Sequence, residues 1–322
     1  MLLDVLRSRR VLFVGGKGGV GKTSISSAIA LARAREGARV LVVSTDPAHN
    51  LGHLWGAEVG DEPVRLATAA HGYVDGIEID PRATVDRHLA AVHDAMRRIL
   101  PERMHPHAKR HLELAREAPG SHEAAVLERV ADTVELAREH YDLLVFDTAP
   151  SGHTLRLMAL PRQLGDWTET LLANRDRSER FSSAMRGLAS GRDSDPERSG
   201  DALIRQALLR RRGRFELLQR TVADPLATGF VIVSVAEPMP VAETLELSES
   251  LRRIGVDIAA LVVNRRSPQD AGELLAARRR LEDRGLRALE DRLPGVPLAE
   301  VPLLGGDPRG EAAVAALADA LP

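Results

Sequence analysis

The chain has 322 residues, of which 44% are hydrophobic, and a formal net charge of −2. A general nucleic-acid binder carries a strong basic excess, so this balance argues against that class of function. The sequence contains no cysteine, which excludes disulfides, thiolate zinc sites and iron–sulfur clusters built by this chain.

The start of the chain, MLLDVLRSRRVLFVGG, has too short an apolar run for a signal peptide. Nowhere do the roughly 18 consecutive apolar residues of a transmembrane helix occur. We therefore expect a cytoplasmic protein without stable membrane insertion and without a nucleic-acid partner.

Short apolar runs alternate with helical stretches along the whole chain. The runs that predict buried strands are residues 11–15, 40–45, 76–79, 142–148, 229–235, 258–264 and 297–304. Most are continuous in Val, Ile and Leu, as buried parallel strands are. The alternation predicts an α/β fold with a doubly wound, mostly parallel sheet. Residues 81–139 and 161–224 show helical patterns without strands. We expect them to form a helical subdomain inserted into a single domain, residues 1–322.

The stretch GKGGVGKT at 16–23 fits the pattern G-x-x-x-x-G-K-[ST], directly after the first strand and before the helical SISSAIALARAR. This context predicts a phosphate-binding loop rather than a simple glycine-rich turn. In such a loop backbone N–H groups surround phosphate, Lys22 reaches the terminal phosphates and Thr23 offers a hydroxyl to Mg²⁺. The predicted nucleotide-binding residues are Gly16, Lys17, Gly18, Gly19, Val20, Gly21, Lys22, Thr23 and Ser24. ATP and Mg²⁺ are the expected cofactors.

Lysine is rare in this sequence: only Lys17, Lys22 and Lys109 occur among 44 basic residues. Two of the three lie in the glycine-rich loop, although an ordinary phosphate loop needs one lysine. A flexible point charge differs from a planar guanidinium, so Lys17 is a candidate catalytic residue beside Lys22.

Two aspartates end predicted strands. Asp46 follows the run 40–45, and Asp147 is the next-to-last residue of DLLVFDT. Carboxylates at the ends of parallel strands beside a phosphate loop can hold Mg²⁺ or its water ligands. Thr23, Asp46 and Asp147 are therefore the predicted metal ligands.

The phrases GGKGGVGKT, STDPAHNL and FDTAPSGHTLRL closely resemble the arsenical-pump and tail-anchored-protein-targeting ATPases, a phosphate-loop family with a deviant Walker A motif. LVVNRR at 261–266 and VPLLGGDPRG at 301–310 are similar to the family's segments near the nucleotide base. The matches extend from residue 11 to about 315. The resemblance implies an ATPase that works as a homodimer, or as a heterodimer with a sister ATPase.

The resemblance also implies roles for single residues. Lys17 would act in trans on the partner's nucleotide, and Asp46 and His49 would belong to the first of two nucleotide-dependent switches. Asp147 and the residues after it would form the second switch. At the base, Asn264 would face adenine, with Pro302 nearby.

Two departures limit the comparison. His53 stands where the targeting branch usually has an aspartate that orients the attacking water, and an imidazole can also accept a proton. The family's arsenite sites and its dimer-clamping zinc site use cysteine, which this chain lacks.

Three functions remain open from the sequence. The first is an ATP-driven dimeric switch whose helical subdomain opens and closes on a protein partner or a hydrophobic membrane-protein segment. The second is an ATPase that energises a membrane anion pump without cysteine. The third is a switch that positions membrane or DNA cargo, although the C-terminal EAAVAALADALP is acidic and poor for membrane binding.

Two clusters in the helical intervals have alternative interpretations. Met96, Met104 and Met185, with several leucines, could line a client groove or simply pack the subdomain. The histidines of HPHAKRH, His105, His107 and His111, favour a polar helix surface over a metal site because no further ligand clearly converges on them.

Overall fold

A computed structural model describes residues 2–46, 50–99, 121–148, 196–306 and 309–322, together with His105, Arg110 and Glu113. The chain divides into two compact units. The first comprises Met1–Asp80, Val134–Met158 and Arg220–Pro322. The second comprises Pro81–Thr133 and Ala159–Gln219, and its described residues are helical.

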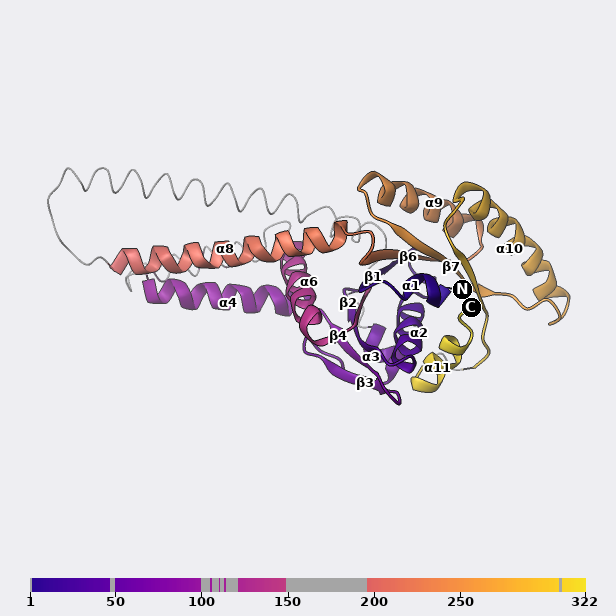
Figure 1. Cartoon of the computed structure of the whole chain (residues 1–322), viewed down its shortest axis with the longest axis horizontal. Helices are drawn as coiled ribbons and strands as arrows, with labels where there is room; N and C mark the ends of the chain where they lie inside the picture. The colour runs from indigo at the N-terminus through magenta and orange to yellow at the C-terminus, as the bar shows by residue number, and fades with distance from the viewer. Residues whose placement is uncertain are drawn as a thin grey trace. The chain divides into compact units, whose positions relative to one another are not determined.

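The first unit is built on an eight-stranded sheet in the order β3-β4-β2-β5-β1-β6-β7-β8 (Figure 1). The strands are β1 (Val11–Gly15), β2 (Arg39–Ser44), β3 (Val64–Thr68), β4 (Tyr73–Glu78), β5 (Leu143–Asp147), β6 (Thr228–Ser234), β7 (Ile258–Arg266) and β8 (Leu298–Pro302). Neighbouring strands are parallel except β3 and β4. The predicted mostly parallel α/β fold is confirmed.

Seven of the eight strands coincide with the predicted apolar runs, and β3 was not predicted. Its sequence, VRLAT, has only Ala67 buried among residues of intermediate or full exposure. An antiparallel strand at the edge of a sheet needs no continuous apolar run, because one face meets solvent. Sequence periodicity over five such residues is too weak to reveal it.

Helices connect the strands of the first unit. They are α1 (Leu2–Leu6), α2 (Lys22–Arg35), α3 (Asn50–Trp55), α9 (Pro238–Arg253), α10 (Glu273–Arg292) and α11 (Glu311–Asp319). The second unit contains α4 (Pro81–Ile99), while α6 (Ser121–His140) and α8 (Pro196–Ala223) begin in the second unit and end in the first.

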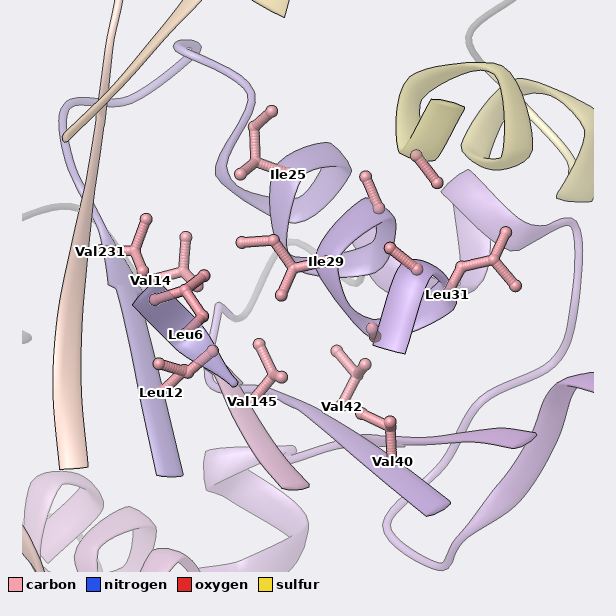
Figure 2. Packing of buried hydrophobic residues seen from close by; sticks show 14 of the residues in the cluster. Leu6, Leu12, Val14, Ile25, Ile29, Leu31, Val40, Val42, Val145 and Val231 are labelled. Carbon is pink, nitrogen blue, oxygen red and sulfur yellow. The ribbon is translucent and has the colours of Figure 1, made fainter. Parts of the chain in front are cut away.

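The two faces of the sheet carry different helices. Alternate strand residues such as Leu12 and Val14 share one buried cluster with Ile25 and Ile29 of α2, as Figure 2 shows. That cluster also includes residues of α1 and α11. Phe13 lies between Leu12 and Val14 in β1 and points to the other face, because side chains alternate along a strand. There its ring stacks on that of Phe146 at 4.8 Å, and α9 and α10 contact β6 and β7.

The second unit has its own buried side chains. In α6 the apolar residues Val126, Leu127, Val130 and Ala131 recur at helical spacing and are buried. Phe215 and Leu218 of α8 are buried as well. Among the described helices, none combines the length and the apolar composition that crossing a bilayer requires.

An ion pair ties β2 to β5 at the ends opposite the phosphate loop. Arg39 donates from Nε to Oδ2 of Asp142 at 3.0 Å and from Nη2 to Oδ1 at 2.9 Å. Its backbone N–H also donates to Oδ2 at 2.9 Å. The hydrogen bond from the Arg39 guanidinium lowers the pKa of Asp142 to about 2.

We predict that Asp142→Asn lowers the free energy of unfolding at pH 7 by about 1 kcal/mol, a modest value because both side chains are nearly half exposed. A carboxylate with a lowered pKa stabilises the fold above its unfolded-state pKa and loses that effect as pH falls toward 2. The difference from the wild type should therefore shrink below about pH 4. Urea titrations followed by circular dichroism between pH 7 and 3 measure it.

The matched control is Asp4→Asn, which breaks the exposed contact with Arg7 at 3.8 Å. It should change the unfolding free energy by less than about 0.5 kcal/mol at any pH. If the free energy of unfolding that Asp142→Asn loses stayed constant from pH 7 down to pH 3, the ion-pair interpretation would be contradicted.

Candidate functional site

The glycine-rich segment forms the turn between β1 and α2. Gly16, Gly19 and Gly21 have φ angles of 151°, 82° and 96°, which side-chain-bearing residues rarely adopt. A Cβ atom on Gly16 would lie 2.1 Å from the Val233 carbonyl oxygen, and one on Gly21 would lie 2.4 Å from the Asn264 amide nitrogen. Only glycine fits at these two positions.

The beginning of α2 is open to an anion. The N-cap residue, Gly21, offers no side-chain hydrogen bond to the first turn. The first backbone N–H groups of a helix lack partners within the helix and carry the positive end of its dipole. Ser24 is half-buried in this turn, Val20 is buried, and Gly18 is exposed before it.

Lys22 is buried at the first position of α2. Its Nζ donates to the carbonyl oxygen of Lys17 at 3.3 Å, across the turn. Burial lowers the pKa of Lys22, while the charges of Asp147 and Asp46 act in the opposite direction. An ammonium group that burial destabilises is favoured by an anion beside it, and phosphate supplies that charge.

Asp147 ends β5 and is 1% exposed. Its Oδ2 accepts a hydrogen bond from the Thr23 hydroxyl at 2.6 Å, and its Oδ1 accepts one from Ser26 at 3.5 Å. Burial raises the pKa of this carboxyl group to about 7, against the opposing effects of the Thr23 hydrogen bond and the Lys22 charge. A cation at this point would restore the ionised form.

Asp46 lies beside the same group. Its negative charge raises the pKa of Asp147 and acts on Lys22. The ends of β2 and β5 are joined directly, since the Thr45 N–H donates to the Asp147 carbonyl at 2.9 Å. The Asn50 amide lies 3.5 Å from Oδ2 of Asp46. Four predicted residues, Lys22, Thr23, Asp46 and Asp147, are thus close in space.

The donor set fits Mg²⁺. This ion prefers oxygen ligands and is bound by one or two carboxylates together with substrate phosphates and water. The Thr23 hydroxyl and the Asp147 carboxylate provide such oxygens, with Asp46 near them. Within the described ranges no group of three or more His, Cys, Asp or Glu side chains is placed to hold a metal without a substrate.

Lys17 points toward α9. Its Nζ lies 2.8 Å from Oε1 of Glu243 and 2.7 Å from Sδ of Met239. The Lys17 side chain is 28% exposed and that of Glu243 is 39% exposed. Nothing in the sequence pointed to Glu243, which lies 226 positions after Lys17 in the chain.

Asn264 lies near the C-terminal end of β7, next to the phosphate loop. Its amide nitrogen donates to the Val20 carbonyl at 2.9 Å, and its Oδ1 accepts from the Arg265 N–H at 2.9 Å. One amide hydrogen and one acceptor position are thus left over. Pro302 ends the neighbouring strand and is exposed.

His53 is exposed on α3 and lines a cavity of about 720 Å³. The other lining residues are Gly52, Gly56, Ala57, Glu58, Val59, Glu78, Arg309 and Gly310. This lining includes neither Lys22 nor Asp147. A role of His53 in orienting water stays a prediction.

The surroundings hold α3 firmly. Oε1 of Glu78 accepts the N–H groups of Leu51 at 2.8 Å and Gly52 at 3.2 Å. The indole N–H of Trp55 donates to the buried Ser27 hydroxyl of α2 at 3.0 Å. The position of α3 therefore depends on both the sheet and α2.

Other predicted residues lie outside the described part of the chain. His49 of the first switch is one, as are His107, His111, Met104 and Met185. The Met96 side chain is likewise undescribed, whereas His105 is half-buried. The groove and histidine-cluster hypotheses thus stay predictions.

Comparison with known proteins assigns this fold and site to a family. Residues 9–322 match the family described as anion-transporting ATPase. The chain is 31% identical to ATPase get3 of Aspergillus terreus, over 98% of this chain and 91% of that protein. It is 29% identical to ATPase ASNA1 homolog 1 of Paramecium tetraurelia, over 96% and 92%. A protein provisionally named arsenical pump-driving ATPase 2, from Aquifex aeolicus, is 30% identical over 91% and 92%. The chain therefore belongs to the anion-transporting ATPase family and is an ATPase.

Proposed function

We propose that this ATPase is a magnesium-dependent dimeric switch in which Lys17 of each copy reaches the nucleotide of the other. The observation that carries the proposal is the division of labour between the two loop lysines. Lys22 is buried across the loop beside Asp46 and Asp147, whereas Lys17 turns away from it toward α9. A second lysine in this position is not used by its own loop and is available to a partner.

Phosphoryl transfer depends mainly on position and charge. The open first turn of α2 and the Lys22 ammonium would bind the β- and γ-phosphates, with Thr23 and Asp147 placed to hold the metal. Bound Mg²⁺ supplies neutralisation of charge on the phosphate oxygens. Burial of Lys22 and Asp147 strengthens these interactions, because water screens them less.

Lys17 completes the site only when two copies close. A cation supplied in trans stabilises negative charge on the transferring phosphoryl group and makes hydrolysis depend on the dimer. The contact of Lys17 with Glu243 is partly exposed, and such ion pairs contribute only about 0–1 kcal/mol. Lys17 can therefore leave α9 at little cost.

The helical unit is the proposed partner-binding part. The relatives carry different names: one is named as an arsenical pump-driving ATPase and others as ATPase get3 or an ASNA1 homolog. For this chain we favour a hydrophobic segment of a membrane protein, bound in the cytoplasm and released as the dimer opens. An amphipathic or apolar segment can bind in a groove between helices, and the groove can open and close when the positions of these helices depend on the bound nucleotide.

The first prediction concerns assembly. Light scattering of the purified chain should give a dimer that tightens in Mg-ATP, and Lys17→Ala should weaken that tightening at least tenfold. The physical reason is the loss of the charge that bridges one copy to the other copy's phosphates. A monomer with and without nucleotide, at concentrations up to those of the cell, would require an ordinary phosphate-loop ATPase or a heterodimer instead.

The second prediction separates the two lysines. Lys22→Ala should abolish binding of fluorescent ATP, whereas Lys17→Arg should bind ATP nearly normally but hydrolyse it at least about tenfold more slowly. Arginine keeps the charge but cannot place it as a compact point donor. Steady-state phosphate release measures the rates.

A matched control for Lys17→Arg is Arg35→Lys, which exchanges the same two residue types at the exposed ion pair with Asp319. It should leave both binding and hydrolysis unchanged. If Lys17→Arg hydrolysed ATP at the wild-type rate, a point charge at residue 17 would not be needed.

The second candidate function is an ATPase that energises an anion pump, which the family description and the Aquifex relative favour. This chain has no cysteine for arsenite, so the anion would need oxygen and nitrogen ligands. Stimulation of ATP hydrolysis by arsenate, phosphate or another oxyanion would support this function, and the absence of any stimulation would count against it.

A further inference from the structure

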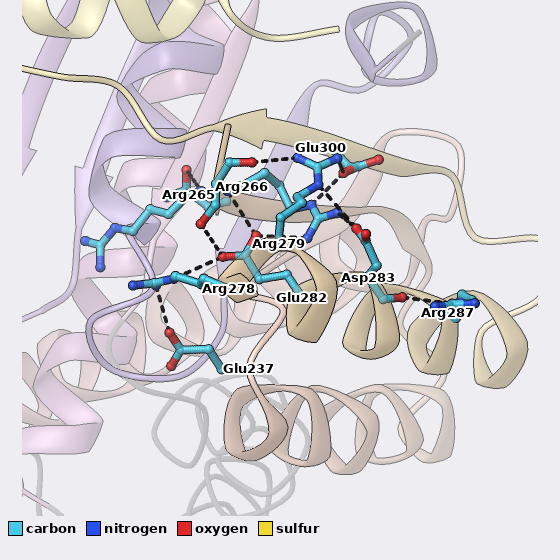
Figure 3. Close-up of polar contacts among 11 residues, drawn as sticks. Glu237, Arg265, Arg266, Arg278, Arg279, Glu282, Asp283, Arg287 and Glu300 are labelled. Atoms are coloured by element: carbon cyan, nitrogen blue, oxygen red, sulfur yellow. Dashed lines mark hydrogen bonds and ion pairs between the residues drawn. The ribbon is translucent and has the colours of Figure 1, made fainter. Parts of the chain in front are cut away.

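Arg266 is the one arginine of the described residues whose side chain is fully buried, at 2% exposed. Its guanidinium contacts three carboxylates: Glu300 of β8 at 2.6 Å, Asp283 of α10 at 2.6 Å and Glu282 of α10 at 3.0 Å, as Figure 3 shows. Burying charges costs free energy even when they are paired, and apolar residues of similar volume often serve stability as well. A function in addition to stability would explain this group.

The location of Arg266 suggests such a function. It follows Asn264 by two positions, and between them Arg265 has a φ of 59°, the only positive φ of a non-glycine residue in the described chain. A left-handed conformation at a residue with a side chain costs about 1–2 kcal/mol and persists only where its surroundings enforce it. The ion pairs of Arg266 hold the far side of this turn.

The turn directs the two side chains to different places. Arg266 enters the carboxylate group between α10 and β8, while Asn264 reaches the Val20 carbonyl of the phosphate loop. Between Val263 and Arg266 the pairing of β7 with β8 is irregular. A change in the position of Arg266 would therefore also change the position of the Asn264 side chain.

Arg266 also holds the neighbouring strand end. The Arg266 carbonyl oxygen accepts a hydrogen bond from the Leu303 N–H at 2.9 Å. In the register of β7 and β8, Arg266 lies opposite Pro302. Leu303 and Leu304 are 42% and 41% exposed. The apolar segment that begins at Pro302 is thus fixed to the Arg266 backbone, and Glu300, two residues earlier in β8, is held by the Arg266 side chain.

Together these contacts place a polar amide and an apolar segment at adjacent strand ends. The amide of Asn264 retains one donor and one acceptor, the pair that recognises the N6 and N7 edge of adenine. We infer that Arg266 is a positioning residue for base recognition: its three ion pairs fix Asn264 and the segment after Pro302 so that the site selects adenine over guanine. The inference rests on the proposed binding of nucleotide at the adjacent phosphate loop.

The test separates recognition of the base from recognition of the phosphates. Isothermal titration calorimetry of the full chain would compare Mg-ATP, Mg-GTP and magnesium tripolyphosphate, which has no base. In Arg266→Lys the charge remains but the fork that contacts three carboxylates is lost. We expect ATP to bind about tenfold more weakly, tripolyphosphate to bind within twofold of the wild type, and the preference for ATP over GTP to narrow.

Arg278→Gln is the matched control. Arg278 belongs to the same network through Glu282 and Glu237, both at 3.0 Å, and neither of these two partners lies on β7 or β8. It should lower the melting temperature without changing the ratio of ATP to tripolyphosphate affinity. If Arg266→Lys does not fold, Glu300→Gln replaces it, because this change weakens the contact with β8 but keeps the buried cation. Glu300→Gln should lower the ratio of ATP affinity to tripolyphosphate affinity, to a smaller extent than Arg266→Lys.

Three outcomes would overturn the inference. Equal weakening of ATP and tripolyphosphate in Arg266→Lys would assign Arg266 to the fold alone, and so would unchanged affinities for both. A wild-type protein that binds tripolyphosphate as tightly as ATP would show that no base is read, while leaving the phosphate site intact. A wild-type protein that binds neither would instead remove the proposed nucleotide function.

Discussion

The central constraint in this molecule is a pair of opposite charges withdrawn from water at the ends of parallel strands. Lys22 and Asp147 are almost completely buried, and burial alone disfavours the charged form of each. Their mutual attraction only partly compensates, since the pKa of Lys22 is still lowered and that of Asp147 is raised to about 7. An anion and a cation bound together would relieve both, which is what Mg-ATP brings.

The rest of the first unit serves to keep this arrangement in place. β1 and β5 are neighbours, so the phosphate loop after β1 and Asp147 at the end of β5 share one edge of the sheet. The apolar face of α2, with Ile25 and Ile29, anchors the helix whose first turn begins at Lys22. Loss of packing there would separate the two charges, and each would then be buried without its partner, at a cost of several kcal/mol.

The sequence predicted this part of the protein because its signals are local. Continuous apolar runs revealed seven strands, and glycine at positions 16 and 21 revealed the loop, since both positions exclude a side chain. The closeness of the two aspartates to the loop could be predicted because parallel strands bring their carboxyl ends to one edge.

Other features depend on contacts between distant parts of the chain, and the sequence could not reveal them. β3 is short and half-exposed, so its periodicity is weak. The contact of Lys17 with Glu243 spans the region from the first strand to α9, and the Arg266 network joins β7, α10 and β8. His53 could be aligned with the family pattern, but the direction of its side chain depends on how Glu78 and Gly310 hold α3. No short-range pattern encodes such contacts.

The N-terminal part of α9 connects the two sides of the site. Glu237, at its N-cap, forms an ion pair with Arg278 of the network, and Glu243, six residues later, forms one with Lys17. The ion pairs of Arg266 and the ion pair of Lys17 differ in strength. The Arg266 guanidinium is itself buried and contacts three carboxylates, of which Glu282 is also buried. The pair of Lys17 with Glu243 is partly exposed on both sides and contributes only about 0–1 kcal/mol. In the proposed dimeric switch, Arg266 would keep the base side of the site fixed, whereas Lys17, the cation proposed to move, is held by a weaker contact.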